Sequence, residues 1–144
     1  MRVDFYQLSQ SSVEVALPQL AAKMRDAAAR VLIVSADQLQ RERIGAALWA
    51  VKDHFLAHGE AGADHDSRQP ILLSGQISPV NGATFLVLAD GQWREGADGF
   101  ERVFLLFDGS TIDDARATWR RLGEASEMER HYWRQEAGSW VKAA

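Results

Sequence analysis

The sequence predicts a single α/β domain of three layers, in which a mostly parallel central sheet is flanked by helices. The chain has 144 residues, of which 47% are hydrophobic and 25% charged, and this composition fits one globular domain over 1–144. Short apolar runs alternate along the chain with stretches in which apolar residues recur at helical spacing. The β-branched run 30–35 is typical of a strand that is buried on both faces.

The first third of the chain predicts two strands and two helices in alternation. Apolar positions alternate over 3–8, and apolar residues then recur at helical spacing over 17–28, with Pro18 tolerable only in the first turn. A strand, a helix and the strand 30–35 make a crossover unit, so the two strands should be parallel. A second helix is expected over 37–51, because it starts with an aspartate suited to the N-cap.

The rest of the chain predicts a polar loop, three more strands and two final helices. The stretch 57–69 contains glycines and polar residues and is expected to be an exposed loop. Strands are expected at 71–74, 84–89 and 103–107. Helices are expected over 111–122 and 125–135.

Composition narrows the class of function. The chain has no cysteine, which excludes disulfides and thiolate metal sites. It has neither the roughly 20 apolar residues of a membrane span nor the apolar run of a secretory signal at its start, so a cytoplasmic location is expected. The net charge of −4 argues against a protein that binds mainly duplex DNA, although it leaves room for a local basic patch.

Motifs for nucleotide binding and catalysis are missing from the sequence. The segments that follow the first two strands, 7–12 and 35–37, contain no glycine that would let the backbone close around a phosphate. Neither G-x-x-x-x-G-K-[ST] nor G-x-S-x-G occurs. We therefore expect a Rossmann-like sheet without a nucleotide motif and a protein without catalytic activity of its own. A non-standard nucleotide site is the minor alternative.

One group of side chains resembles a set of metal ligands: His54, His58, Asp64, His65 and Asp66. The two histidines that are four residues apart would share a helix face if the second helix extended that far. The H-E-x-x-H pattern is absent, and the other three residues fall in the polar loop. A solvated loop is the favoured interpretation, and we expect neither a metal nor a cofactor.

The helix over 37–51 carries a tryptophan on the side that should face away from the sheet. Its apolar stripe is formed by Ile44, Ala47, Leu48 and Val51. At 100° per residue, Trp49 lies roughly 150° from this stripe. The ring is then either covered by the loop 52–60 or offered to a partner, and Phe55 and Leu56 would extend such a patch.

The helix over 111–122 combines an aromatic ring with arginines. Arg116, Trp119 and Arg120 are spaced i, i+3 and i+4, so they are neighbours on the helix surface. Two guanidinium groups beside a ring could hold a short acidic peptide that ends in an aromatic residue. A core tryptophan with two solvated arginines fits the sequence equally well.

Several segments taken together resemble the chi subunit of bacterial DNA polymerase III. They are 4–6, 30–33, 46–49, 55–58 and 103–120. The similarity covers nearly the whole chain in the right order. The specific part is the combination of Leu-Trp, then Phe-x-x-His, then a basic and aromatic final segment.

This resemblance implies a non-catalytic accessory subunit of the clamp-loader complex, within the DNA-directed DNA polymerase holoenzyme. Its implied partners are the psi subunit and the acidic, Pro-Phe-ending C-terminal tail of single-stranded DNA-binding protein (SSB). The psi-binding surface would comprise Trp49, Phe55, Leu56 and His58. The tail-binding groove would comprise Leu105, Arg116, Trp119 and Arg120. A helicase is the alternative partner at the psi-facing surface, and DNA would be contacted mainly indirectly.

The chain departs from the family pattern at three places. A lysine is common where Ile112 stands, so one tail contact would be lost or moved to Arg121. A tyrosine is common where Trp119 stands, and the stretch after Trp49 lacks the proline often seen there.

Two rival functions are an uncharacterised nucleotide-binding enzyme and a direct binder of single-stranded DNA that stacks bases on exposed tryptophans. The acidic balance disfavours the latter.

Overall fold

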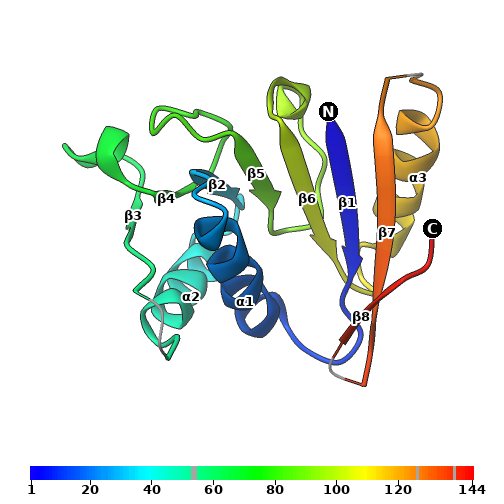
Figure 1. Ribbon diagram of the computed structural model, residues 1–144, viewed down its shortest axis with the longest axis horizontal. Coiled ribbons are helices and arrows are strands. Elements are labelled where there is room, and N and C mark those ends of the chain that lie inside the picture. The colour runs from blue at the N-terminus through cyan, green and yellow to red at the C-terminus, as the bar shows by residue number, and fades with distance from the viewer. Residues whose placement is uncertain (53–54, 126, 138) are drawn as a thin grey trace.

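The computed structural model describes residues 1–52, 55–125, 127–137 and 139–144. Within these residues, eight strands form one sheet in the order β3-β4-β2-β5-β6-β1-β7-β8, and three α-helices pack on it (Figure 1). The strands are β1 (Arg2–Gln7), β2 (Val31–Val34), β3 (His58–Glu60), β4 (Ile71–Ser74), β5 (Phe85–Leu88), β6 (Arg102–Phe107), β7 (Glu129–Glu136) and β8 (Ser139–Lys142). The helices are α1 (Val13–Asp26), α2 (Gln38–Trp49) and α3 (Ile112–Leu122).

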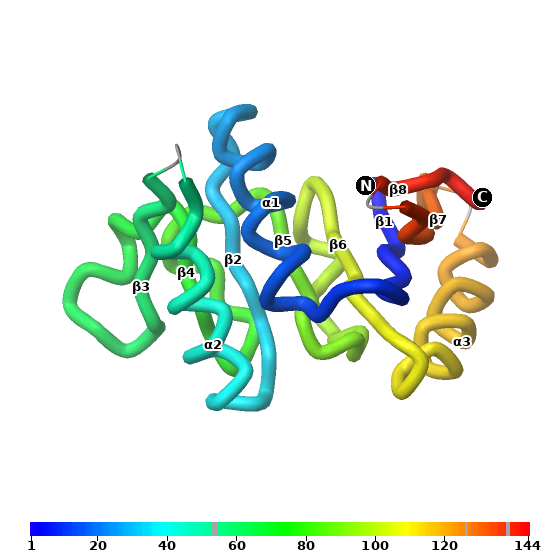
Figure 2. The backbone as a smooth tube through the Cα atoms, turned by 90° about the horizontal axis from the view of Figure 1, so that it is seen from below, coloured from blue at the N-terminus to red at the C-terminus, as the bar shows by residue number. Residues whose placement is uncertain are grey.

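The predicted α/β class and the mostly parallel sheet are confirmed. Every neighbouring pair of strands is parallel except β7 and β8, which form an antiparallel hairpin. The first two strands are parallel as predicted, but β5 and β6 lie between them. Figure 2 shows this succession from β3 at one end of the sheet to β7, β8 and α3 at the other.

The central strands contribute side chains to two cores, because successive residues point to opposite faces of a sheet. On one face Ile33 and Leu106 pack with α1 and α2. On the other face Leu105 of β6 packs with α3, and Leu32 belongs to the same core. The central strands are therefore apolar on consecutive residues, as expected of strands that are covered on both sides.

Helix α1 begins four residues before the predicted start, and this places Pro18 beyond the first turn. The expectation that the proline marks the first turn was wrong. Pro18 is buried in the core beside Leu17 and Leu20. Burial of this apolar face offsets the hydrogen bond that the proline ring cannot donate, since most helix stability in proteins comes from tertiary packing.

The helix expected over 125–135 does not form, and strand β7 runs through most of that range. β7 pairs in parallel with β1, which places Tyr132 opposite Phe5 and Trp133 opposite Tyr6. β1 lies far from β7 in the sequence, so the pairing of β7 with β1 cannot be seen in the local pattern of residues 125–135. Strand β3 was also missed, because its three residues fall inside the stretch expected to be a loop.

A buried carboxylate ties three strands together at the right-hand part of the sheet in Figure 1. Asp4 of β1 is fully buried. It accepts hydrogen bonds from Arg102 Nε of β6 at 2.8 Å, from Arg2 Nη2 at 3.0 Å and from Trp133 Nε1 of β7 at 2.9 Å. Burial by itself would raise the pKa of Asp4, but these hydrogen bonds outweigh it and hold the pKa below its ordinary value.

We predict that Asp4→Asn lowers the free energy of unfolding by about 3 kcal/mol or more, because it removes the buried carboxylate that two arginines share. Urea denaturation followed by circular dichroism measures this loss. The control is Asp98→Asn, an exposed aspartate, whose expected effect is within about 0.5 kcal/mol. Equal losses in the two variants would contradict the role assigned to Asp4.

The advantage of the wild type over Asp4→Asn should depend on pH. The pKa of Asp4 is lower in the folded state than in the unfolded chain, so the stabilisation is complete well above the unfolded value of about 3.9. It is lost as the pH falls through the lower, folded-state pKa. Urea midpoints at pH 7, 5, 4 and 3 should show a constant difference that shrinks only at the acidic end. A difference that grows on acidification would be the opposite result.

Candidate binding surfaces

An aromatic patch lies at the end of α2, near the β3 edge of the sheet. Trp49 is the last residue of α2 and its side chain is 60% exposed. Its ring centroid lies 4.6 Å from that of His58 and 5.8 Å from that of Phe55, which is 81% exposed. Phe55 and His58 therefore touch Trp49 without covering it. We call Trp49, Phe55 and His58 the aromatic patch.

Leu56, the fourth residue of the expected psi-binding surface, lies apart from this patch. Its side chain is only 2% exposed and belongs to the core beneath α1 and α2. Its carbonyl oxygen lies 2.7 Å from Nδ1 of His58. Leu56 thus anchors the segment and holds the His58 ring in place rather than presenting a surface of its own.

A cavity of about 460 Å³ opens beside the aromatic patch. Trp49, His58, Gly45 and Leu73 give it apolar walls. Its charged lining residues are Arg41, Glu42 and Glu60. An apolar hollow with charges of both signs at its rim suits a protein partner better than a highly charged polymer.

We predict that Trp49→Ala costs less than about 1 kcal/mol of unfolding free energy, because the ring is mostly in water already. The adjacent Leu48 is buried, and Leu48→Ala should cost about 2–5 kcal/mol. Urea denaturation of both variants measures the contrast. A large loss for Trp49→Ala would mean that the ring is a core residue and not a contact residue.

A second surface lies at the other end of the sheet, around α3. Trp119 is half-buried, with its ring edge-on to Phe5 at 5.1 Å and to Tyr132 at 5.7 Å. The guanidinium of Arg130 stacks over the Trp119 ring at 4.1 Å and donates from Nη1 to the Trp119 carbonyl oxygen at 2.6 Å. Trp119 is therefore both a packing residue and part of a basic surface.

The other residues expected in the tail-binding groove differ in exposure. Arg116 and Arg120 are exposed on α3, and neither forms an ion pair with another described residue. Leu105 is fully buried in β6 within the core that Trp119 packs against. Its side chain supports the surface from beneath and does not reach it in this conformation.

Strand β7 adds residues to this surface that sequence reasoning missed. Arg130 and Tyr132 contact Trp119, and Arg134 follows at the same two-residue spacing. Burial raises the pKa of Tyr132, while the nearby charges of Arg116 and Arg134 oppose that rise. The signal for these residues was their alternation, which is typical of a strand. We define the basic–aromatic surface by Arg116, Trp119, Arg120, Arg130, Tyr132 and Arg134.

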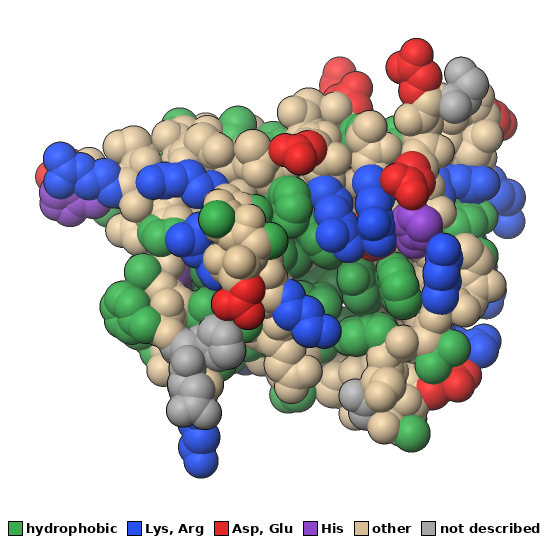
Figure 3. Space-filling view, viewed as in Figure 1, with side chains coloured by type: hydrophobic (Ala, Val, Ile, Leu, Met, Phe, Trp, Pro, Cys, Tyr) green, Lys and Arg blue, Asp and Glu red, His purple; other side chains and the backbone are tan. Residues whose placement is uncertain are grey.

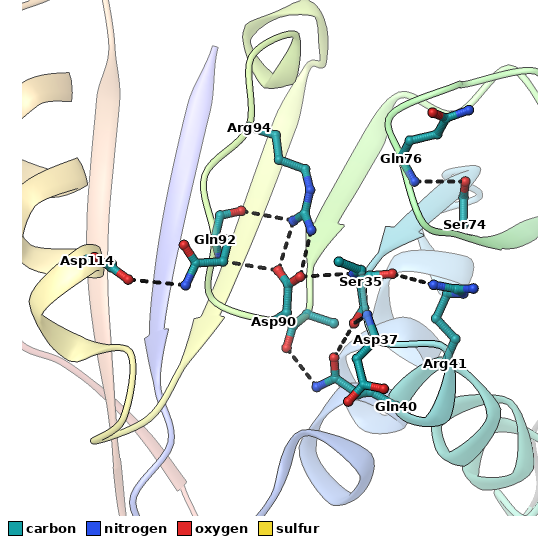
Figure 4. A network of polar contacts seen from close by, with 12 residues as sticks. Ser35, Asp37, Gln40, Arg41, Ser74, Gln76, Asp90, Gln92, Arg94 and Asp114 are labelled. Carbon is teal, nitrogen blue, oxygen red and sulfur yellow. Dashed lines mark hydrogen bonds and ion pairs between the residues drawn. The ribbon is translucent and has the colours of Figure 1, made fainter.

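The carboxyl ends of the parallel strands, where nucleotides bind in many α/β folds, hold a network of polar side chains (Figure 4). Arg94 donates from its two terminal nitrogens to both oxygens of Asp90, at 2.8 and 2.6 Å. Arg41 donates to the Ser35 carbonyl oxygen and to Glu60. Burial alone would raise the pKa of Asp90, but the Arg94 hydrogen bonds lower it overall. Two arginines that could bind phosphate are thus engaged by the protein itself.

The histidine and aspartate group does not assemble into a ligand set in the part of the chain that the structure describes. No three His, Cys, Asp or Glu side chains there come close enough to hold a metal ion. Asp66 accepts hydrogen bonds from the backbone of its own loop, at Gly62 and Ala63. His54 lies outside the described residues. None of the described helices could cross a membrane.

The structure defines a single α/β domain with two exposed surfaces that are candidates for binding other molecules. The sequence model of the DNA polymerase III chi subunit family, HolC, matches residues 1–130 of the chain. The protein therefore belongs to this family of accessory subunits of the replicative polymerase. No curated protein matches the chain. The family match includes all of α2 and α3 but stops within β7.

Proposed function

We propose that the protein is an accessory subunit of the DNA polymerase III clamp-loader complex that tethers it to SSB. The basic–aromatic surface would bind the acidic C-terminal tail of SSB, and the aromatic patch would bind the psi subunit. The observation that supports this most is the position of the two exposed surfaces at opposite ends of one sheet. Two partners could then be bound at once without competing.

The basic–aromatic surface suits an acidic peptide with an aromatic end. Arg116 and Arg120 are exposed and form no ion pair with another described residue, so carboxylates of a tail can accept charge-assisted hydrogen bonds from them. Trp119 and Tyr132 offer aromatic edges for the terminal ring. Ile112 packs into the core at the start of α3, whereas Arg121 is exposed and can supply the contact that a lysine makes elsewhere in the family.

The aromatic patch suits a partner that binds more firmly. Trp49 and Phe55 expose large apolar areas side by side, and such residues dominate the binding energy of protein interfaces. The psi subunit is the partner we propose, with a helicase as the alternative. Leu56 would contribute indirectly, by fixing the segment that carries Phe55 and His58.

In this proposal the protein acts by tethering and performs no catalysis. A weak contact to a coated template, joined to a firm contact with the polymerase assembly, raises the local concentration of one near the other. SSB would contact the DNA, so the protein would reach it indirectly. This work takes place where the bacterial chromosome is copied, in the cytoplasm.

Fluorescence anisotropy with a labelled SSB-tail peptide from the same host tests the tail contact. We predict saturable, salt-sensitive binding that is lost when the terminal Phe is removed. Arg116→Ala should weaken binding by about tenfold, the loss of one charge-assisted hydrogen bond. The matched control is Arg68→Ala, an exposed arginine at the other end of the sheet, which should leave the affinity unchanged.

A matching experiment tests the aromatic patch. Trp49→Ala should abolish binding to purified psi and leave the affinity for the tail peptide as it is, while Arg116→Ala should do the reverse. If either substitution weakened both contacts equally, the two-surface proposal would fail.

A further inference from the structure

A groove that neither proposed surface includes lies on the face of the sheet opposite α3. Helices α1 and α2 cover the β2 side of this face, and over β6, β1 and β7 the view from the front is open (Figure 1). A cavity of about 580 Å³ lies here between Leu20 of α1 and Trp140 of the β7–β8 hairpin. A second hollow of about 170 Å³ continues it along α1 and shares Tyr6, Leu20, Lys23 and Arg102 with it.

The floor of the groove is a packed aromatic layer. Tyr6 stacks on Trp133 with ring centroids 6.2 Å apart and meets Trp140 edge-on at 4.9 Å. Phe104 and Phe85 continue the layer toward β5. Burial raises the pKa of Tyr6 to about 12, so its hydroxyl adds no negative charge at neutral pH. The volume falls within the range of ligand-binding cavities, and the floor is already formed.

The rim of the groove carries positive charge, although the protein as a whole is acidic. Arg2 and Arg102 share the single carboxylate of Asp4, so one of the two guanidinium charges has no counter-charge there. Lys23 is exposed and forms no ion pair with any described residue. Glu129 acts on Arg2 as well, but its carboxylate bonds to His131. Figure 3 shows Lys and Arg side chains around a hydrophobic hollow on this face.

We propose that this groove binds an acidic peptide segment of a partner protein, which inserts one large apolar side chain between α1 and the hairpin and places carboxylates against Lys23 and Arg102. Charge complementarity and the apolar floor together select this chemistry. Single-stranded nucleic acid shares the negative charge but needs open ring faces for its bases. Tyr6 and Phe104 are almost fully buried, and Trp133 packs against Tyr6, so the rings of the floor do not offer the open faces that stacked bases need.

The five tryptophans make the test site-specific, because Trp133 and Trp140 line the groove whereas Trp119 and Trp49 mark the two other surfaces. The experiment is a ¹⁵N–¹H NMR titration of the indole signals, assigned by Trp→Phe substitution. The probe is a peptide of five aspartates followed by phenylalanine. We expect saturable shifts of the Trp133 and Trp140 signals that vanish when the Phe is replaced by Ala.

Two further variants, each with a matched control, test the contact: one fills the cavity with a larger side chain, and the other removes a positive charge from its rim. Gln19 lines the cavity from α1, and Gln19→Trp should fill it and weaken the Trp140 response by about tenfold. Val15→Trp, on an exposed α1 position outside the lining, should leave the response unchanged. Lys23→Gln should weaken the response, and Lys142→Gln on the hairpin should not.

The outcomes separate this inference from the tethering proposal. A shift of Trp119 alone would overturn the groove inference and leave the tail site intact. Shifts of Trp133 and Trp140 that persist in the Arg116→Ala, Arg120→Ala double variant would support the groove even if the tail site failed. Oligothymidine that shifts Trp133 and Trp140 at lower concentration than the peptide does would overturn the inference in favour of nucleic acid.

Discussion

The pairing of Asp4 with two arginines and a tryptophan is the constraint on which this end of the molecule depends. A buried carboxylate is tolerated only when its hydrogen bonds are satisfied, and the donors to Asp4 come from β1, β6 and β7. The three strands must therefore keep one register. A slip of β1 by one residue would carry Asp4 to the opposite face and leave Arg102 and Trp133 without their acceptor, whereas Arg2 would move with Asp4 on the same strand.

The same register sets the two faces of this part of the sheet. Tyr6 points with Asp4 toward the groove, while Phe5 between them points toward α3 and packs against Trp119. The groove and the basic–aromatic surface are thus built on opposite sides of the same three strands. Movement of β7 would disturb both at once, because Tyr132 lies on one side and Trp133 on the other.

The local sequence pattern predicted the buried strands and placed Trp49 on the outer side of its helix, because runs of apolar residues indicate buried strands and helical spacing shows which residues share a helix face. It failed for β7, whose pairing with β1 joins residues more than a hundred positions apart. That one error hid Arg130, Tyr132 and Arg134 from the expected tail site. The sequence also did not predict that Leu56 and Leu105 are buried, because the burial of a side chain depends on which distant elements pack over it.

The net charge of the protein does not by itself decide which ligands its two basic sites can bind. Charges separated by more than about 8 Å are largely screened at physiological salt, so a peptide at α3 or in the groove responds to the few cations beside it. A long polyanion reaches further and also responds to the net charge of −4 of the whole chain. The distribution of charge therefore favours short acidic peptides with an apolar anchor over nucleic acid as ligands of these two sites.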